Sequence, residues 1–123
     1  MDERQIVIID DDEFFLMLAR TVLEGAGYKV HTLSDSTVAK RYILSGVKPA
    51  MIIVDVLMPD LNGDEVARLL KEDAETKSIP ILFISGMSAK ELSERVQKTG
   101  VNGYLTKPFS FDQLVESVRK IVP

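Results

Sequence analysis

The chain has 123 residues, 46% of them hydrophobic, which is enough to bury the core of one domain without disulfides. A formal net charge of -4 argues against a nucleic-acid-binding surface, which needs clustered basic residues, and the lack of cysteine excludes thiolate chemistry and cysteine-based zinc sites. The N-terminal residues lead into a run of only four apolar residues, so the sequence predicts neither a signal peptide nor a membrane span, and we expect a cytoplasmic protein.

Short apolar runs alternate with amphipathic stretches of helical length from one end of the chain to the other. Residues 6–9, 51–54 and 81–84 are continuously apolar, which is typical of strands covered on both faces in a parallel sheet. Residues 28–33 alternate between apolar and polar, which predicts a half-exposed edge strand, and residues 104–106 are a shorter candidate for the opposite edge.

Five helices are predicted between and after these strands. The first spans about residues 14–26 and ends at Gly27. Its inward face is expected to consist of Phe15, Leu18, Ala19, Val22 and Leu23. The other helices are expected over residues 36–45, from Asp64, from Ala89 to Gly100, and from Ser110 onward. Five strand-helix units in succession predict an α/β fold with right-handed crossovers and a doubly wound parallel sheet.

In a sheet of this kind the ligand site lies beyond the carboxyl ends of the strands. The residues there are Asp10 and Asp11 after the first strand, Asp55 after the third, Ser85 after the fourth, and Lys107 just past the fifth. Adjacent carboxylates repel one another unless a cation or a proton intervenes, and carboxylate oxygens suit Mg²⁺. This set of side chains can therefore hold Mg²⁺ and a phosphoryl group together.

These strand ends resemble those of the receiver domains of two-component response regulators, such as the chemotaxis response regulators. The resemblance covers essentially the whole chain. The residues that support it are Ile9-Asp10-Asp11, Val54 to Pro59 followed by Asn62-Gly63, Ile84-Ser85-Gly86 and Tyr104 to Phe109. It implies a flavodoxin-like fold of five strand-helix units with strand order 2-1-3-4-5. It also implies one receiver domain over residues 1–123 with no output domain in this chain, either as a stand-alone protein or as a domain cut from a longer one.

The resemblance makes Asp55 the phosphoacceptor, a carboxylate nucleophile that forms an aspartyl phosphate. It implies that Mg²⁺ is bound by Asp55, by Asp11 directly, by Asp10 through water and by the backbone carbonyl of Leu57. The cation then neutralises charge on the transferring phosphoryl group. A helix-capping or loop role is the alternative for Asp55.

The acidic triplet at residues 10–12 also allows a plainer interpretation, because Asp is favoured at the N-cap and in the first turn of a helix. The whole triplet can then be a solvated cluster that caps the following helix. Asp12 lies one residue beyond the acidic pair of the family. We interpret it, together with Glu13, as charge at the start of the first helix.

Three further residues stand at the family's switch positions. Lys107 is expected to pair with a phosphoryl oxygen or with Asp55, and its bond to Pro108 is expected to be cis. Ser85 stands where the family has a Ser or Thr whose hydroxyl is drawn to the phosphoryl group, and Tyr104 is the aromatic residue that turns inward as Ser85 moves. Each has a plainer alternative: a surface lysine before a turn, a turn serine, and an aromatic residue packed on an edge strand.

The implied function is a signalling switch whose phosphorylation changes the surface of the fourth helix, fifth strand and fifth helix. It is no enzyme beyond catalysis of its own phosphorylation and dephosphorylation. The expected partners are a histidine kinase or a histidine phosphotransfer domain and an unidentified downstream protein. A phosphorylation-dependent dimer is a further option, and direct contact with nucleic acid or a membrane is not expected.

Phe14 and Met17 fall toward solvent on the first helix when Phe15 and Leu18 face inward. Scattered exposed apolar residues are normal, which is one interpretation of this pair. The other is a docking patch for the kinase or phosphotransfer domain, since family partners approach there. His31, the single histidine, lies on the predicted edge strand and is interpreted as a surface residue rather than a phosphorelay histidine.

Two positions depart from the best-known pattern of the family. Leu57 and Met87, two residues after Asp55 and Ser85, are apolar where many relatives carry groups that orient an attacking water molecule. This departure predicts slow self-dephosphorylation.

Three other functions are alternatives to a phosphorylated receiver. A phosphatase of the haloacid-dehalogenase type also uses an Asp nucleophile and Mg²⁺, but it needs a second Asp where this chain has Leu57. A flavodoxin-like FMN carrier needs a phosphate-binding loop after the first strand, where residues 10–12 would repel the phosphate. A receiver-like scaffold that is never phosphorylated does not need the complete acidic site that the sequence contains.

Overall fold

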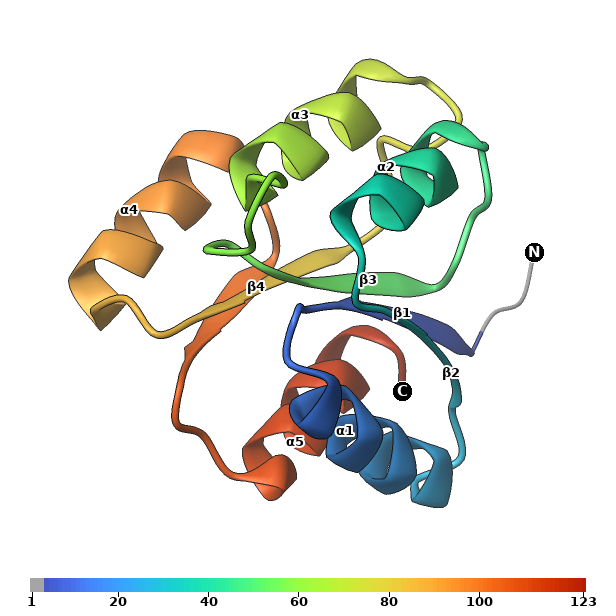
Figure 1. The fold of residues 1–123 in the computed structure, drawn as a ribbon, viewed down its shortest axis with the longest axis vertical. Coiled ribbons are helices and arrows are strands. Elements are labelled where there is room, and N and C mark those ends of the chain that lie inside the picture. The colour runs from blue at the N-terminus through green and yellow to red at the C-terminus, as the bar shows by residue number, and fades with distance from the viewer. Residues whose placement is uncertain (1–3) are drawn as a thin grey trace.

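The computed structural model describes residues 4–123, in which five strands alternate with five helices (Figure 1). The strands are β1 (Gln5–Ile9), β2 (Lys29–Leu33), β3 (Met51–Asp55), β4 (Ile81–Ser85) and β5 (Gly103–Thr106). The helices are α1 (Glu13–Gly25), α2 (Ser36–Leu44), α3 (Gly63–Glu72), α4 (Ala89–Thr99) and α5 (Phe111–Ile121). Within the described range, no helix is both long and apolar enough to cross a membrane.

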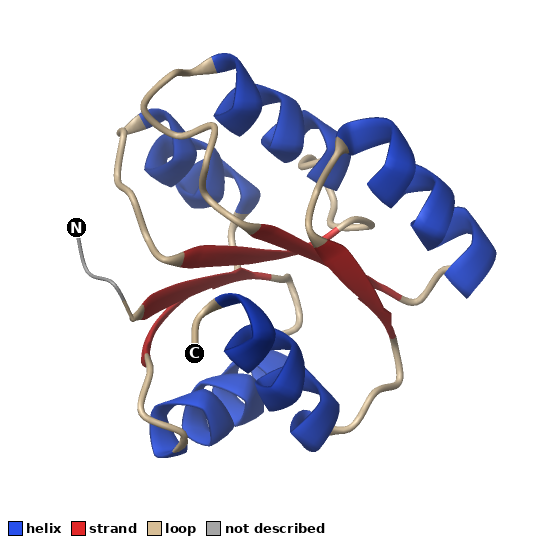
Figure 2. Ribbon diagram, turned by 180° about the vertical axis from the view of Figure 1, so that it is seen from behind, coloured by secondary structure: helices blue, strands red, loops and turns tan. Residues whose placement is uncertain are grey.

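All five strands are parallel and lie in the order β2-β1-β3-β4-β5. Helices α1 and α5 cover one face of the sheet, and α2, α3 and α4 cover the other (Figures 1 and 2). The chain reverses its direction of travel across the sheet at β1, which has β2 on one side and β3 on the other. The predicted doubly wound, flavodoxin-like α/β fold with strand order 2-1-3-4-5 is confirmed.

The core has two layers because successive strand residues point to opposite faces of the sheet. In β1, Val7 and Ile9 pack under the α2-α3-α4 layer, while Ile6 and Ile8 pack under α1 and α5. Every residue of β3 and β4 is buried, which explains why their sequences are apolar without alternation. The edge strands β2 and β5 keep exposed or half-buried positions, as their patterns predict.

The inward face of α1 is confirmed in part. Ala19 and Leu23 are buried as predicted, Leu16 is buried although it was not predicted, and the predicted Phe15, Leu18 and Val22 are half-buried. The reason is that α1 contacts α5 as well as the sheet, so its most buried stripe faces the groove between them. The ring of Phe15 lies at the edge of this interface, where it contacts the rings of Phe109, just before α5, and Phe111, the first residue of α5.

The helix ends follow the local sequence closely. Gly100 adopts φ +76° and ends α4 in the left-handed conformation, as predicted, and Ser110 caps α5 with a reciprocal capping box. Helix α3 begins at Gly63, one residue before the predicted Asp64, because the side chain of Asn62 accepts a hydrogen bond from the backbone N–H of Asp64. A side chain at Gly63 would meet Val56 at 3.2 Å, so the start of α3 lies close against the end of β3.

Candidate functional site

The turn between β1 and α1 buries one carboxylate and exposes its neighbour. Asp10 is fully buried, and its Oδ1 accepts a hydrogen bond of 3.0 Å from the backbone N–H of Asp12. The Asp12 side chain in turn accepts a hydrogen bond of 3.1 Å from the backbone N–H of Phe15. Asp12 is therefore the N-cap of α1, which agrees with its predicted place at the start of the helix. Asp11 lies between them and is exposed.

The ends of β3 and β4 are shaped by two similar turns. Asp55 Oδ1 accepts a hydrogen bond of 2.9 Å from the N–H of Leu57, two residues onward. The Oγ of the buried Ser85 accepts a hydrogen bond of 3.1 Å from the backbone N–H of Met87, again two residues onward. Because Asp55 pairs with Ile84 in the sheet register, these two turns lie at neighbouring strand ends. Both functional side chains are therefore held by the backbone that follows them.

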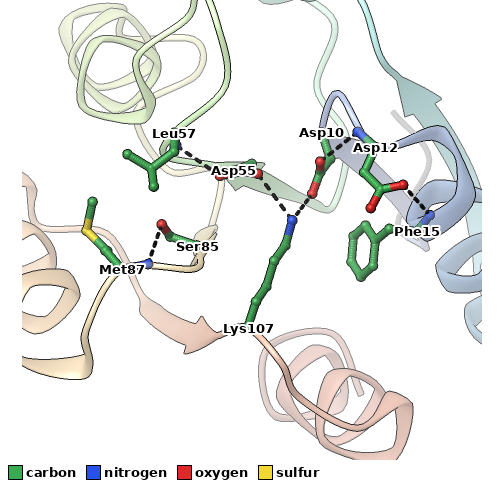
Figure 3. Close-up of polar contacts among 8 residues, drawn as sticks. All are labelled: Asp10, Asp12, Phe15, Asp55, Leu57, Ser85, Met87 and Lys107. Carbon is green, nitrogen blue, oxygen red and sulfur yellow. Dashed lines mark hydrogen bonds and ion pairs between the residues drawn. The ribbon is translucent and has the colours of Figure 1, made fainter.

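Lys107 joins the two carboxylate sites (Figure 3). Its Nζ lies 2.7 Å from Asp10 Oδ2 and 3.2 Å from Asp55 Oδ2. The backbone N–H of Lys107 donates to the carbonyl of Ser85 at 2.7 Å, which fixes the loop after β5 beside β4. The Lys107-Pro108 peptide bond is cis, as predicted. The contact with Asp55 was among the expected pairings, whereas the shorter contact with Asp10 was not.

Burial and pairing set the electrostatics of this ion pair. Burial raises the pKa of the Asp10 carboxyl, and the hydrogen bond from Lys107 opposes that rise without cancelling it. Burial lowers the pKa of the Lys107 ammonium, but the hydrogen bond to Asp10 and the charges of Asp10 and Asp55 together outweigh it, so this pKa is raised. The ammonium therefore stays charged between the two carboxylates.

Three carboxylates are close enough to share one cation. Asp10, Asp11 and Asp55 each offer an oxygen, and these oxygens all lie within 4.8 Å of one another. Asp10 and Asp55 are buried and Asp11 is exposed, so the group faces the protein interior on one side and solvent on the other. Carboxylate oxygens are hard ligands and suit a hard divalent cation. The residues present therefore fit a metal ion at this edge of the sheet.

The other predicted residues lie around this centre. Tyr104 is on the edge strand β5 with 37% of its surface exposed, so its ring lies partly in solvent. Phe14 and Met17 are exposed on α1 to 67% and 55%. Leu57 is also exposed, and Met87 is half-buried against the core. The structure thus brings Asp10, Asp11, Asp55 and Lys107 together and places the remaining residues around them.

His31 is exposed on the edge strand β2, where its ring lies 5.4 Å from that of Tyr42. This placement confirms that it is a surface residue. The sequence predicts Phe15 on the core face of α1 and does not predict that its ring lies 4.9 Å from Lys107 Nζ beside the acidic site. Its position three residues after the capping Asp12 is the one local signal that places it near the strand end.

Residues 6–119 match the family described as the response regulator receiver domain. The chain belongs to this family. Among similar proteins, the polar-differentiation response regulator DivK of Brucella anthropi is 27% identical, with 94% of each chain covered. A putative response regulator from Chloroflexus aurantiacus has a solved structure that is 30% identical with a TM-score of 0.87, and 98% of each chain is covered.

The chemotaxis response regulator CheY4 of Vibrio cholerae is 25% identical, with a TM-score of 0.86 over 98% of this chain and 99% of that one. As a member of this family, the protein is a signalling switch of two-component systems rather than an enzyme. Its acidic pocket of Asp10, Asp11 and Asp55 with Lys107 fits a switch that works through an aspartyl phosphate.

Proposed function

We propose that Asp55 is the phosphoacceptor of this receiver domain and that it takes its phosphoryl group from a histidine kinase or a histidine phosphotransfer domain. The observation that supports this most is the convergence of three carboxylates with one ammonium at the carboxyl edge of the sheet. A carboxylate oxygen of Asp55 attacks phosphorus, an O–P bond forms, and the P–N bond to the donor histidine breaks. The departing imidazole takes up a proton.

Mg²⁺ is the cation we propose for the acidic group. Asp10, Asp11 and Asp55 would hold it, Asp10 through water, together with the backbone carbonyl of Leu57. When bound, the cation supplies positive charge that offsets the charge on the transferring phosphoryl group. Mg²⁺ suits a site with few protein carboxylates because it keeps several water ligands.

Lys107, Ser85 and Tyr104 are proposed as the parts that sense the phosphoryl group. The contact of the Lys107 ammonium with Asp55 supports this, and the ammonium would pair with a phosphoryl oxygen on Asp55. The hydroxyl of Ser85 is buried at the neighbouring strand end, and its motion toward the phosphoryl group frees space for the partly exposed ring of Tyr104. This exchange changes the surface of α4, β5 and α5, which a downstream partner or a second copy of the domain reads.

Intact mass measurement tests the phosphoacceptor directly. The wild type is incubated with Mg²⁺ and acetyl phosphate, and its mass is compared with that of Asp55→Asn treated in the same way. We expect the wild type to gain one phosphoryl group and the variant to gain none. Equal phosphorylation of both proteins contradicts the assignment of Asp55, and a wild type that is never phosphorylated favours an interaction scaffold.

The exposed pair Phe14 and Met17 is proposed as part of the docking surface for the phosphoryl donor. Both lie on α1, the helix that starts at the acidic site. Replacing Phe14 by Ser should slow phosphotransfer from the cognate kinase and leave phosphorylation by acetyl phosphate unchanged, because the small donor needs no protein interface. An equal effect on both donors would show that the substitution acts on the site rather than on docking.

A long-lived aspartyl phosphate is also proposed. The side chain of Leu57 is 57% exposed and Met87 is half-buried, so the two positions flanking the site offer apolar groups to an attacking water molecule. Once acetyl phosphate is removed, the phosphorylated mass should decay over minutes or longer. Decay within seconds would contradict the proposal.

A further inference from the structure

The ammonium of Lys107 lies against an aromatic ring as well as against the carboxylates. Its Nζ is 4.9 Å from the ring centroid of Phe15, inside the roughly 6 Å within which an aromatic face attracts a cation. Figure 3 shows this ring on the side of Lys107 where Asp12 caps α1. The ammonium is thus bounded by Asp10 and Asp55 and by the ring of Phe15.

The ring of Phe15 is itself held by its neighbours. Phe109 meets it edge to face, with centroids 5.8 Å apart and planes at 89°, and Phe111 stacks on it at 6.2 Å and 20°. Both partners follow Lys107 closely in the sequence. The segment that supplies the ammonium therefore also supplies the rings that orient the face of Phe15.

The backbone of Phe15 is tied to the same site. Its N–H donates to the Asp12 side chain, the N–H of Asp12 donates to Asp10, and the other oxygen of Asp10 accepts from Lys107. Lys107 in turn contacts the ring of Phe15. Phe15, Asp12, Asp10 and Lys107 are therefore linked in a ring of contacts, although Lys107 is separated from Asp10 by 97 positions in the chain.

We propose that Phe15 is a positioning residue for Lys107 in the phosphorylation reaction. The proposal rests on the proposed function of Asp55. The side chain of Lys107 is flexible, and the ring favours the conformations that direct its ammonium into the site. An aromatic face attracts the cation without neutralising it, so the full charge stays available to a phosphoryl oxygen. An aliphatic side chain of similar size fills the space but lacks this attraction.

Variants of Phe15 distinguish the effect of the aromatic ring on the phosphorylation rate from the effect of side-chain volume. Phe15→Leu should lower the initial rate of phosphorylation by acetyl phosphate roughly fivefold, while Phe15→Tyr, which keeps the ring, should stay within about twofold of the wild type. Leu16→Val is the matched control, because it removes buried volume from the next residue of α1 within the core cluster beneath that helix. The control should keep the wild-type rate. A normal rate for Phe15→Leu, or an equal loss for Leu16→Val, overturns the proposal.

A double-mutant comparison distinguishes positioning from a general structural role. If Phe15 acts through Lys107, Phe15→Leu should cause no further loss of rate in a Lys107→Met background. A fivefold loss in both backgrounds overturns the proposal. An NMR titration with Mg²⁺ alone should give the same affinity, within about twofold, for wild type and Phe15→Leu, since Phe15 is not one of the proposed metal ligands. A parallel loss of Mg²⁺ affinity also contradicts the proposal.

One further measurement does not depend on phosphorylation. The ring of Phe15 should shift the NMR signals of the Lys107 ε-methylene protons upfield, and this shift should disappear in Phe15→Leu and persist in Phe15→Tyr. If Lys107→Met accepts no phosphoryl group, the double-mutant comparison cannot be made, and this NMR shift then tests the contact between Phe15 and Lys107. Signals that are identical in all three proteins overturn the proposal. If the wild type is not phosphorylated on Asp55, the proposed function fails, whereas a phosphorylated wild type with an unaffected Phe15→Leu refutes only the role of Phe15.

Discussion

The two edges of the sheet each place a cation against an aromatic ring, with different results. At the edge where the strands begin, the Arg4 guanidinium lies 4.4 Å from the ring centroid of Tyr28 and donates to the backbone oxygens of Gly27 and Pro123. At the edge where the strands end, Lys107 lies 4.9 Å from the ring of Phe15 and donates to carboxylates. The cation-ring contact is common to both edges, and the hydrogen-bond acceptors differ.

The group of three carboxylates makes the second edge chemically different from the first. The contacts of Arg4 with Gly27 and Pro123 link the residue before β1 to the turn before β2 and to the segment after α5. Side-chain carboxylates repel one another and are nucleophiles, so Lys107 stabilises a group that is costly to fold and chemically useful. A cavity of about 530 Å³ lies at the Arg4 edge, lined by Pro49, Pro80 and Ile121 among others. The group of three carboxylates lies at the opposite edge of the sheet, so the proposed site coincides with this group and not with that cavity.

The largest expected effect comes from removing the cation of the functional edge. Lys107→Met leaves the fully buried Asp10 facing Asp55 without a counter-charge. Because an unpaired buried carboxylate is strongly destabilising and Lys107 is only partly exposed, we expect the free energy of unfolding to fall by about 2 kcal/mol. Urea denaturation without divalent cations measures this change. Adding Asp10→Asn to Lys107→Met should restore most of the loss, and no restoration would mean that Asp10 is not the source of the effect.

At the other edge, Tyr28→Phe should change stability without changing function. The hydroxyl of Tyr28 donates to the carbonyl of Val122 and ties the start of β2 to the end of the chain. Its removal leaves a buried carbonyl without that donor, so we expect a loss of about 1 kcal/mol. The rate of phosphorylation by acetyl phosphate should stay within about twofold of the wild type. A large fall in that rate would show that the two edges are coupled through β1 and β2.

Much of this arrangement could be predicted from the sequence because it depends on short-range patterns. The continuous apolar runs of β1, β3 and β4 indicate strands buried on both faces, and the strand-end rule then places Asp10, Asp55 and Lys107 at one edge. Glycine and serine at helix ends give the boundaries of α4 and α5. The resemblance to receiver domains adds the strand order, which periodicity does not contain.

The rest depends on contacts between residues far apart in the chain. The buried face of α1 includes Leu16 where α5 packs beside the helix, and a helical wheel of α1 contains no information on α5. Lys107 lies nearer to Asp10 than to Asp55, although Asp10 follows β1, which is farther from β5 in the sheet than β3 is. Tertiary packing determines both the buried face of α1 and the position of the Lys107 ammonium, and local sequence patterns do not contain this information.

The smallest expected effect makes Tyr42 a matched counterpart of Tyr28. The Tyr42 hydroxyl is buried and has no hydrogen-bond partner among the described residues, whereas that of Tyr28 has one. Tyr42→Phe removes a polar group that folding strips of water, so it should raise the free energy of unfolding by up to about 1 kcal/mol at neutral pH. The same substitution thus has opposite signs at the two positions.

The pH dependence sharpens this contrast. Burial raises the pKa of Tyr42 above its ordinary value of 10.0, so the unfolded chain ionises first as the pH rises. The stability of the wild type is therefore unaffected by this ionisation below pH 10 and falls as the pH rises from 10 through the higher folded-state pKa of Tyr42. Urea denaturation of wild type and Tyr42→Phe between pH 7 and about pH 11 should show the advantage of the variant growing above pH 10. A variant that is less stable at neutral pH would mean that the hydroxyl finds a partner in solution, with water or His31 as the nearest candidates.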